Sequence, residues 1–426
     1  FEATNGILQG CAVSSIFINV LMTIWMKMVD DMGNGYEVQV RDLPPRPRDS
    51  EGVRNGEPDT RPRALTVASI GYADDCYPIR NDTRQLRQPL EMTAAWLKDT
   101  GQVINASKSL SFEANDENPA EVLLDGEVMP RKKNFKSLGI ELFTVPTDSM
   151  GEVMTNRIAK AKVLLVRTMQ IQGGFTKRME IISTLILATG IYGAEGASID
   201  RTALQALDTA AVNAMWGERQ GTRAKEIILC VLLPGHRVSP AMKVPYMRIM
   251  WLATSCKRQR STQYTIQAIW ESSTSPPPTG PVGRALKEVY ALGWTSLNGW
   301  WLWQVPGQDD PLDFCNDSMG SIQHKVRDSL RYANLIRLEK RRPRQYAGMG
   351  GAVQRNMVAN ALQHFTTEDE LRAARQVLSG PKHGPTPARN WWTLPTVTIV
   401  QRGWKTSNTF SGGARRGTKP DAHGPR

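Results

Sequence analysis

Two adjacent aspartates, Asp74 and Asp75, stand between two short β-prone segments and constrain the fold of this chain more than any other feature. Ala64–Ile70 is rich in β-branched residues, and Cys76–Ile79 follows as a return strand, so the sequence predicts a hairpin with the aspartates at its turn. Like charges about 4 Å apart repel by roughly 4 kcal/mol near a protein surface unless cations lie between them. A pair of divalent metal ions, as used in phosphoryl or nucleotidyl transfer, would supply those cations.

The net charge of the chain indicates the class of partner. The 426 residues include 53 Lys and Arg against 41 Asp and Glu, which gives a formal net charge of +12. Such a balance favours a polyanion such as nucleic acid through counterion release, although many basic proteins bind nothing in particular. With 40% hydrophobic residues the chain has the means to build a core, so the composition argues against global disorder.

The cysteines and the apolar runs indicate the cellular compartment in which the protein is expected. Five cysteines are scattered without CxxC or CxxH spacing, which supports neither a zinc knuckle nor a disulfide framework and fits a reducing compartment. Neither a signal peptide nor an apolar run of membrane-spanning length is found, so we expect no membrane association and a nuclear or cytoplasmic location. The chain opens on Phe1 in what reads as mid-domain sequence, which suggests a fragment of a longer protein.

The first third of the chain alternates between helical and extended patterns. A helix capped by Ser14 or Ser15 should be largely buried, because its apolar residues from Ile16 to Met28 cover most of its circumference. Gly33–Arg63 is polar and proline-rich, as expected of a surface excursion. A helix over Thr83–Thr100, a hairpin turning at Asp125 and Gly126, and a strand over Phe135–Phe143 follow.

Beyond Pro146 the periodicity becomes helical. Three helices are predicted, one with Met154, Ile158, Ala161 and Leu165 on one face, one over Lys177–Thr189, and one with Leu204, Leu207, Ala211 and Met215 on one face. A Ser/Pro linker at Ser272–Pro281 precedes a tryptophan cluster, Trp294, Trp300, Trp301 and Trp303, and a helix over Met319–Leu338. The tryptophans suit the core of a small module better than stacking platforms for bases.

These patterns predict an α+β fold with several parts. The expected divisions are a mixed α/β part at 1–145, a helical part at 146–220, a helical connector at 221–271, a helical, Trp-rich module at 282–400 and a basic, disordered tail at 401–426. The basic run Lys340–Arg344 reads either as a phosphate grip or as a solvated helix end.

The aspartates have neighbours that together form an ordered set of motifs. Gln9–Ser15 precedes them, Gly101–Ser109 follows the next helix, and Phe135–Ile140 follows the hairpin. In this order and spacing the segments resemble the later motifs of reverse transcriptases, most closely those of non-LTR (LINE-like) retrotransposons. Gly190–Glu195 is similar to a Tyr-Gly-Ala-Glu patch that these elements carry after the palm.

The resemblance implies a partial polymerase palm, an antiparallel sheet with packed helices, followed by a helical thumb. It implies an RNA-directed DNA polymerase that uses an RNA template, a DNA primer, dNTPs and two Mg²⁺ ions, or Mn²⁺ in their place. The residue roles it implies are metal binding and catalysis by Asp74 and Asp75, a lysine near the triphosphate at Lys108, template or nucleotide contacts at Gln9, Gly10, Ser14 and Tyr72, and a primer-grip strand with Phe135, Leu138 and Gly139.

Two departures from the family pattern qualify this expectation. Ala12-Val13-Ser14-Ser15 stands where the family usually has Pro-Leu-Ser-Pro, so a preset first helical turn is lost. The family's third catalytic carboxylate lies on a strand before Gln9, so the chain alone is expected to have little or no polymerase activity. The alternatives are a degenerate palm and thumb that only bind nucleic acid, a group II intron maturase and an RNA-dependent RNA polymerase. The oligomeric state is open.

Overall fold

The computed structural model describes residues 12–40, 63–72, 75–102, 108–114, 120–144, 147, 149–171, 174–216, 224–258, 260–272 and 280–348 of the chain. Within these ranges helices predominate, and the strands form four two-stranded sheets and one three-stranded sheet, all antiparallel. The mixture confirms the α+β class in its coarse form. No helix in the described ranges is long and apolar enough to cross a membrane.

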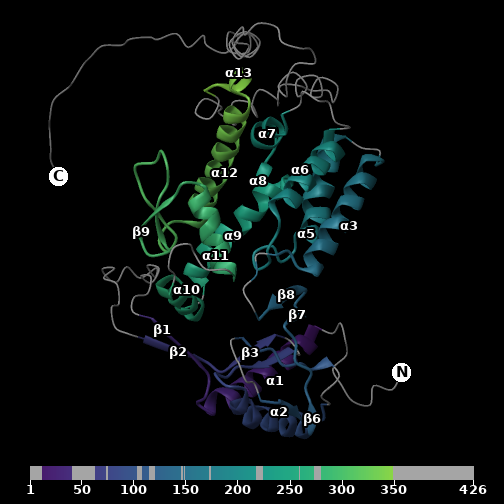
Figure 1. The fold of residues 1–426 in the computed structure, drawn as a ribbon, viewed down its shortest axis with the longest axis vertical. Helices are drawn as coiled ribbons and strands as arrows, with labels where there is room; N and C mark the ends of the chain where they lie inside the picture. Colours follow the sequence, from purple (N-terminus) through teal and green to yellow (C-terminus); the bar gives the residue numbers. More distant parts are fainter. Residues whose placement is uncertain are drawn as a thin grey trace, which may run out of the picture.

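The N-terminal part holds two helices and a series of short strands at one end of the molecule (Figure 1). The predicted helix after Thr83 is present as a 3₁₀ turn followed by α2, and Gly101 ends it with a φ of +71°. Asp125 and Gly126, with φ values of +50° and +83°, make the predicted two-residue turn between β5 and β6. The elements are α1 (Ala12–Asp31), β1 (Tyr36–Val40), β2 (Arg63–Val67), β3 (Ser69–Tyr72), β4 (Asp75–Pro78), η1 (Thr83–Leu86), α2 (Arg87–Asp99), β5 (Leu123–Leu124), β6 (Glu127–Val128), β7 (Asn134–Ser137) and β8 (Ile140–Phe143).

Helix α1 forms as predicted, but the expectation that it is largely buried is wrong. Trp25 and Val29 are fully buried, and with Ala68 and Trp96 they form the core beneath the helix. The other face is exposed and carries Ile16, Phe17, Val20 and Ile24, which are between 46% and 62% exposed. Among the described residues α1 packs mainly against β3 and α2, and Met22 also contacts Cys76 of β4, so the largely apolar opposite side stays exposed.

The expectation that Gly33–Arg63 is a surface excursion is wrong at its start. Tyr36–Val40 is strand β1, which pairs with β2, and Val38 and Val40 are buried against Tyr264 and Ala268. Those two residues lie on α10 (Arg260–Ser272), so the β1–β2 ribbon reaches from the N-terminal part to the helical part (Figure 1). The predicted strand Ala64–Ile70 is divided at Ala68, because β2 pairs with β1 and β3 pairs with β4. Residues 41–62 lie outside the described ranges.

The middle of the chain is helical, as its periodicity predicts. Met154, Ile158, Ala161 and Leu165 are all buried on one face of α3, and Leu204, Leu207, Ala211 and Met215 are buried on α6. The helix predicted over Lys177–Thr189 is also present, with a π-helical turn in its middle. These elements are α3 (Glu152–Met169), α4 (Phe175–Ile181), η3 (Ile182–Ile186), α5 (Leu187–Gly190) and α6 (Arg201–Trp216).

The remaining described residues build a second large core, although Ile228, Leu229, Leu233, Val238 and Val244 pack into the core of α3 and α6. Trp294, Trp300, Trp301 and Trp303 are at most 5% exposed, which confirms that the tryptophan cluster is core. The same core includes side chains from both sides of 273–279, so residues of the connector and of the Trp-rich module pack together. The elements of this part of the chain are α7 (Lys225–Ile227), η4 (Ile228–Leu232), α8 (Gly235–Val238), α9 (Pro240–Arg258), α10, α11 (Gly280–Ala291), β9 (Thr295–Asn298), β10 (Leu302–Gln304), β11 (Leu312–Asp313), α12 (Met319–Arg341) and α13 (Pro343–Tyr346).

Candidate functional site

The predicted hairpin is present as the antiparallel pair β3 and β4. Tyr72, at the end of β3, pairs with Asp75, at the start of β4, so Ala73 and Asp74 are the two residues between the strands. Tyr72 is 59% exposed and Asp75 is also exposed. Asp74 itself lies outside the described residues, as do Gln9 and Gly10. The turn therefore presents one described carboxylate and one aromatic ring at the surface.

The hairpin rests on helix α1. A Cβ atom on Gly71 would lie 3.1 Å from Sδ of Met26, so glycine permits this close approach between strand and helix. Cys76 Sγ lies 3.8 Å from Met22 Sδ, which adds a second contact along the same face. Ser14 belongs to the first turn of α1, and its side chain is outside the description. The β3–β4 hairpin thus lies against helix α1, as the sequence leads us to expect.

Tyr77 joins the β3–β4 hairpin to strand β7. Its hydroxyl lies 2.8 Å from the Ser137 hydroxyl on β7, and its ring lies 6.5 Å from that of Phe135. Phe112 packs edge-on against Phe135 at 4.6 Å between ring centroids. Burial raises the pKa of Tyr77, the Ser137 hydrogen bond opposes this rise, and the negative charge of Asp75 adds to it. Asp75, Tyr77, Ser137 and Phe135 therefore form one contiguous group.

Leu138 and Gly139 do not lie within a strand, so the single strand predicted over Phe135–Phe143 is wrong. They form the turn of a hairpin between β7 and β8, in which Ser137 pairs with Ile140. Leu138 has a φ of +49° and Gly139 a φ of +77°, the left-handed pair that a tight two-residue hairpin turn needs. Leu138 is 45% exposed as a result, and Phe135 alone of the predicted primer-grip residues packs in a sheet.

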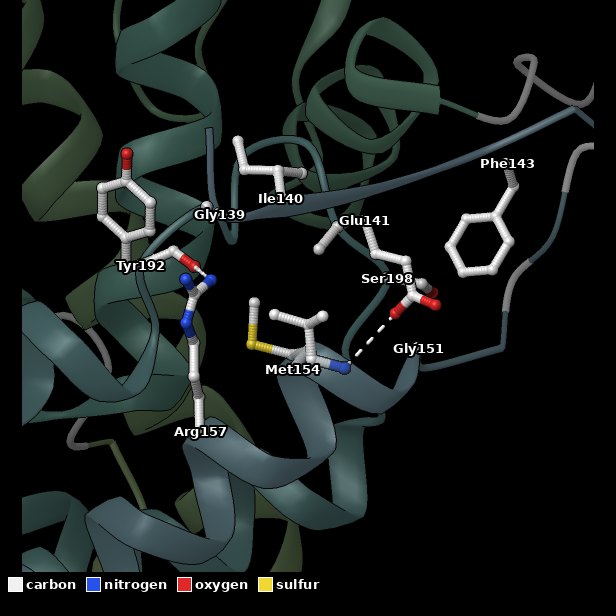
Figure 2. Close-up of a pocket in the computed structure, with 12 residues that line it drawn as sticks. Gly139, Ile140, Glu141, Phe143, Gly151, Met154, Arg157, Tyr192 and Ser198 are labelled. Atoms are coloured by element: carbon white, nitrogen blue, oxygen red, sulfur yellow. Dashed lines mark hydrogen bonds between the residues drawn. The ribbon is translucent and has the colours of Figure 1, made fainter. Parts of the chain in front are cut away.

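The β7–β8 turn meets the segment that contains the Tyr-Gly-Ala-Glu patch (Figure 2). Arg157 of α3 lies between them, with its guanidinium 4.9 Å from the centroid of the Tyr192 ring and its Nη1 donating to the Tyr192 carbonyl over 2.9 Å. A Cβ atom on Gly139 would lie 2.8 Å from Nη2 of Arg157, and one on Gly193 would lie 2.7 Å from Cγ1 of Ile140. Both glycines also have φ values in the left-handed region, +77° and +80°, which other residues adopt only with strain.

Two more arginines of the helical part, Arg248 and Arg284, bind the turn at residues 191–197, which begins within the Tyr-Gly-Ala-Glu patch. Arg248 donates to the Ala194 and Ala197 carbonyls at 3.0 and 2.9 Å and pairs with Glu288 at 2.7 Å. Arg284 donates to the Gly196 carbonyl over 2.7 Å. Glu141 on β8 meanwhile accepts from the Val153 backbone amide in the first turn of α3 at 3.3 Å (Figure 2). The turn and the β7–β8 hairpin are thus fixed to the helices by charged hydrogen bonds.

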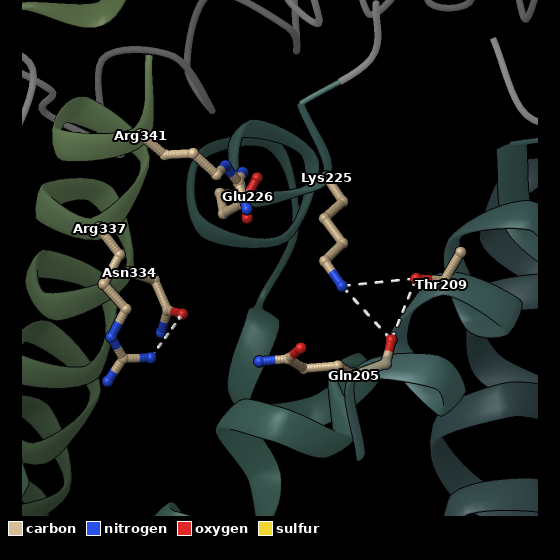
Figure 3. A network of polar contacts seen from close by, with 7 residues as sticks. All are labelled: Gln205, Thr209, Lys225, Glu226, Asn334, Arg337 and Arg341. Atoms are coloured by element: carbon tan, nitrogen blue, oxygen red, sulfur yellow. Dashed lines mark hydrogen bonds and ion pairs between the residues drawn. The ribbon is translucent and has the colours of Figure 1, made fainter. Parts of the chain in front are cut away.

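Lys108 and the basic run at the end of α12 are largely exposed, and one arginine of the run forms an ion pair. Lys108 is exposed at the start of the described segment 108–114. Arg341 forms an ion pair with Glu226 at 2.7 Å, next to Lys225, which donates to the Gln205 carbonyl over 3.3 Å (Figure 3). Lys340 and Arg344 are exposed. Part of the run therefore serves to attach α12 to α7, and the rest faces solvent.

The donor set at the hairpin fits a hard divalent cation in part. Carboxylate oxygen is the ligand that Mg²⁺ and Mn²⁺ prefer, and Asp75 offers it at the surface. In the part of the chain that the structure describes, no group of three or more His, Cys, Asp or Glu side chains could hold a metal ion. Asp75 would thus supply one ligand, with Asp74 beside it in the chain.

Comparisons with known proteins add nothing to this picture. No family model matches the chain, and no curated protein matches it either.

The sequence motifs missed several residues that define the site. Tyr77 and Ser137 are 60 positions apart, and Arg157 and Tyr192 are 35 apart, so no local spacing signals either contact. The left-handed turn at Leu138 and Gly139 had a signal, since a glycine between two short β-prone runs is typical of a hairpin.

Proposed function

We propose that this chain is the palm and thumb region of an RNA-directed DNA polymerase of the non-LTR retrotransposon type, which adds dNTPs to a DNA primer on an RNA template. The observation that carries the proposal is the two-residue turn between Tyr72 and Asp75, with both side chains exposed and the hairpin seated on α1. Carboxylate oxygen is the ligand that Mg²⁺ prefers, so the exposed Asp75 and its chain neighbour Asp74 are candidate ligands for the two ions.

Each residue at the turn has a definite task in this proposal. Bound Mg²⁺ ions would stabilise the charge that develops on the attacking and leaving oxygens. Asp75 and Asp74 would hold these ions, and the exposed ring of Tyr72 would offer an apolar surface to the terminal sugar of the primer. Gly71 keeps the hairpin close against Met26, which limits the movement of the carboxylates relative to α1.

The β7–β8 hairpin lies beside the β3–β4 hairpin and supports it. The Tyr77 to Ser137 hydrogen bond fixes the distance between β4 and β7, and the Glu141 carboxylate of β8 accepts from the Val153 amide of α3. A primer bound along both hairpins would therefore meet a single rigid surface. The exposed Leu138 side chain at the second turn would contact the sugar-phosphate backbone through its apolar surface.

Metal binding is the first test, because no third acidic ligand accompanies Asp75 among the described residues. Free Mn²⁺ is measured by electron paramagnetic resonance during titration of the protein. Asp74→Asn and Asp75→Asn should each weaken Mn²⁺ binding about tenfold or more, since each removes a charged ligand. Asp99→Asn is the matched control, because Asp99 is an exposed aspartate at the end of α2.

Primer–template binding and extension complete the test. An RNA template annealed to a labelled DNA primer should bind the chain, and any dNTP-dependent extension should require a divalent metal and Asp74. Equal Mn²⁺ affinity in all three variants would overturn the polymerase proposal. Nucleic-acid binding that is indifferent to Asp74 and to metal would then support the alternative of a module that only binds nucleic acid.

A further inference from the structure

Two cysteines that are 59 positions apart meet inside the second core. Cys315 Sγ lies 3.2 Å from Cys256 Sγ, and the two residues are 1% and 0% exposed. Cys256 is in the last turns of α9, and Cys315 is in the turn between β11 and α12. We propose that Cys256 and Cys315 are a dithiol modification site, which peroxide oxidises to an intrachain disulfide between α9 and this turn.

The backbone around Cys315 is fixed by hydrogen bonds. The Asp313 carboxylate accepts from the backbone amides of Cys315 and Asn316 at 2.7 and 3.1 Å. Asp317 in turn accepts from the Asp313 amide over 3.1 Å. These bonds close the turn on itself, so the Cys315 side chain has one well-defined direction.

Lys257 ties this turn to the helix that carries the other thiol. Its ammonium donates to the Cys315 carbonyl over 3.0 Å and to the Asp317 carbonyl over 2.6 Å. Because Lys257 follows Cys256 directly, the two chain segments are held together beside the sulfur atoms. A disulfide has a sulfur–sulfur bond of about 2.05 Å, so the thiols need to approach by only about 1 Å.

The chain contains an internal comparison for this pair. Cys230 is also buried, but the sulfur nearest to it is the Met242 thioether at 3.9 Å. A thioether cannot form a disulfide, so Cys230 is as buried as Cys256 and Cys315 but has no thiol partner in this contact. Cys230→Ser is therefore a matched control for the Cys256→Ser and Cys315→Ser variants.

The oxidation balances with hydrogen peroxide as the oxidant. One thiolate attacks peroxide, the O–O bond breaks, and a sulfenic acid and one water form. The second sulfur then attacks the sulfenic sulfur, the S–S bond forms, and a second water leaves. Two thiols are oxidised and one peroxide is reduced. Burial raises the pKa of the Cys256 thiol, so little thiolate is present and the reaction should be slow.

The experiment uses the full chain, fully reduced, then treated with hydrogen peroxide and blocked with a thiol reagent under denaturing conditions. Mass spectrometry of a non-reduced digest should contain a peptide linked through Cys256 and Cys315, and these two of the five cysteines should no longer react with the thiol reagent. Oxidation should raise the Tm by roughly 5 °C, and dithiothreitol should reverse both changes. The crosslink should persist in Cys230→Ser and vanish in Cys256→Ser and Cys315→Ser.

Three results would overturn the proposal. They are a linkage through another cysteine in place of this pair, oxidation of either thiol to sulfinic acid without a crosslink, and survival of both thiols through oxidation of the folded protein. The mapping on the unmodified chain decides the matter even where a serine variant fails to fold, because it requires no substitution.

Discussion

At the scale of single residues, Asp208 is the buried carboxylate with the clearest structural task. Its Oδ1 accepts from the Ser239 hydroxyl at 2.8 Å and from the Ala241 amide at 3.1 Å, so α6 caps the start of α9. Burial raises the pKa of Asp208 from 3.8 to about 6, and these two hydrogen bonds oppose the rise. Lys225 lowers the pKa and Glu226 raises it by smaller amounts.

Asp208 should therefore make stability depend on pH. Because the folded-state pKa is the higher one, its contribution is complete below about pH 4 and is lost as pH rises through about 6, a change of about 3 kcal/mol. Asp208→Asn keeps an Oδ1 acceptor but does not titrate. Urea unfolding at pH 4 and pH 7 should show the wild-type losing stability relative to this variant on going to the higher pH. A constant difference between the two proteins would contradict the prediction.

At the scale of elements, the contact between α3 and α5 depends on two small residues. A Cβ atom on Gly190 would lie 2.6 Å from Cβ of Ala161, which is closer than two carbon atoms can approach. Both residues are buried, and Gly190 also precedes the turn that the three arginines bind. The separation of these helices is thus set by the absence of a side chain at one position.

Gly190→Ala should lower the free energy of unfolding by about 1–3 kcal/mol through overpacking, even though alanine is the better helix former. Ala161→Gly in the same chain should restore part of the loss, because it removes the atom that clashes. Chemical unfolding of the two single variants and the double variant measures this coupling. Additive effects would show that the contact does not set the helix separation.

At the scale of the whole molecule, the net charge of +12 bears on nucleic-acid binding. Each phosphate contact releases a condensed counterion, so affinity falls steeply with salt. About four contacts would reduce the affinity for an RNA–DNA duplex about 100-fold between 50 and 200 mM KCl. Fluorescence anisotropy at a series of salt concentrations, with duplexes of unrelated sequence, measures this slope. A flat dependence would mean that the basic side chains are a solvated surface and not a binding face.

The sequence by itself determined what depends on near neighbours in the chain. The buried faces of α3 and α6, the turn at Asp125 and Gly126, and the hairpin that ends at Asp75 follow from periodicity and from turn residues. The tryptophan cluster was also predicted as core, because large aromatic residues at that density are seldom left exposed. Apart from the packing of the tryptophans, each of these depends on interactions across a few residues.

Only the tertiary structure decided which apolar surface is covered and which distant polar groups meet. Helix α1 has apolar residues nearly all round, so its periodicity held no information on which side β3 and α2 would cover. Strand β1 is buried by α10, which lies more than two hundred residues later in the chain. The pairs Tyr77 with Ser137, Arg157 with Tyr192, and Cys256 with Cys315 arise in the same way, because packing of separate elements, not local spacing, brings them together.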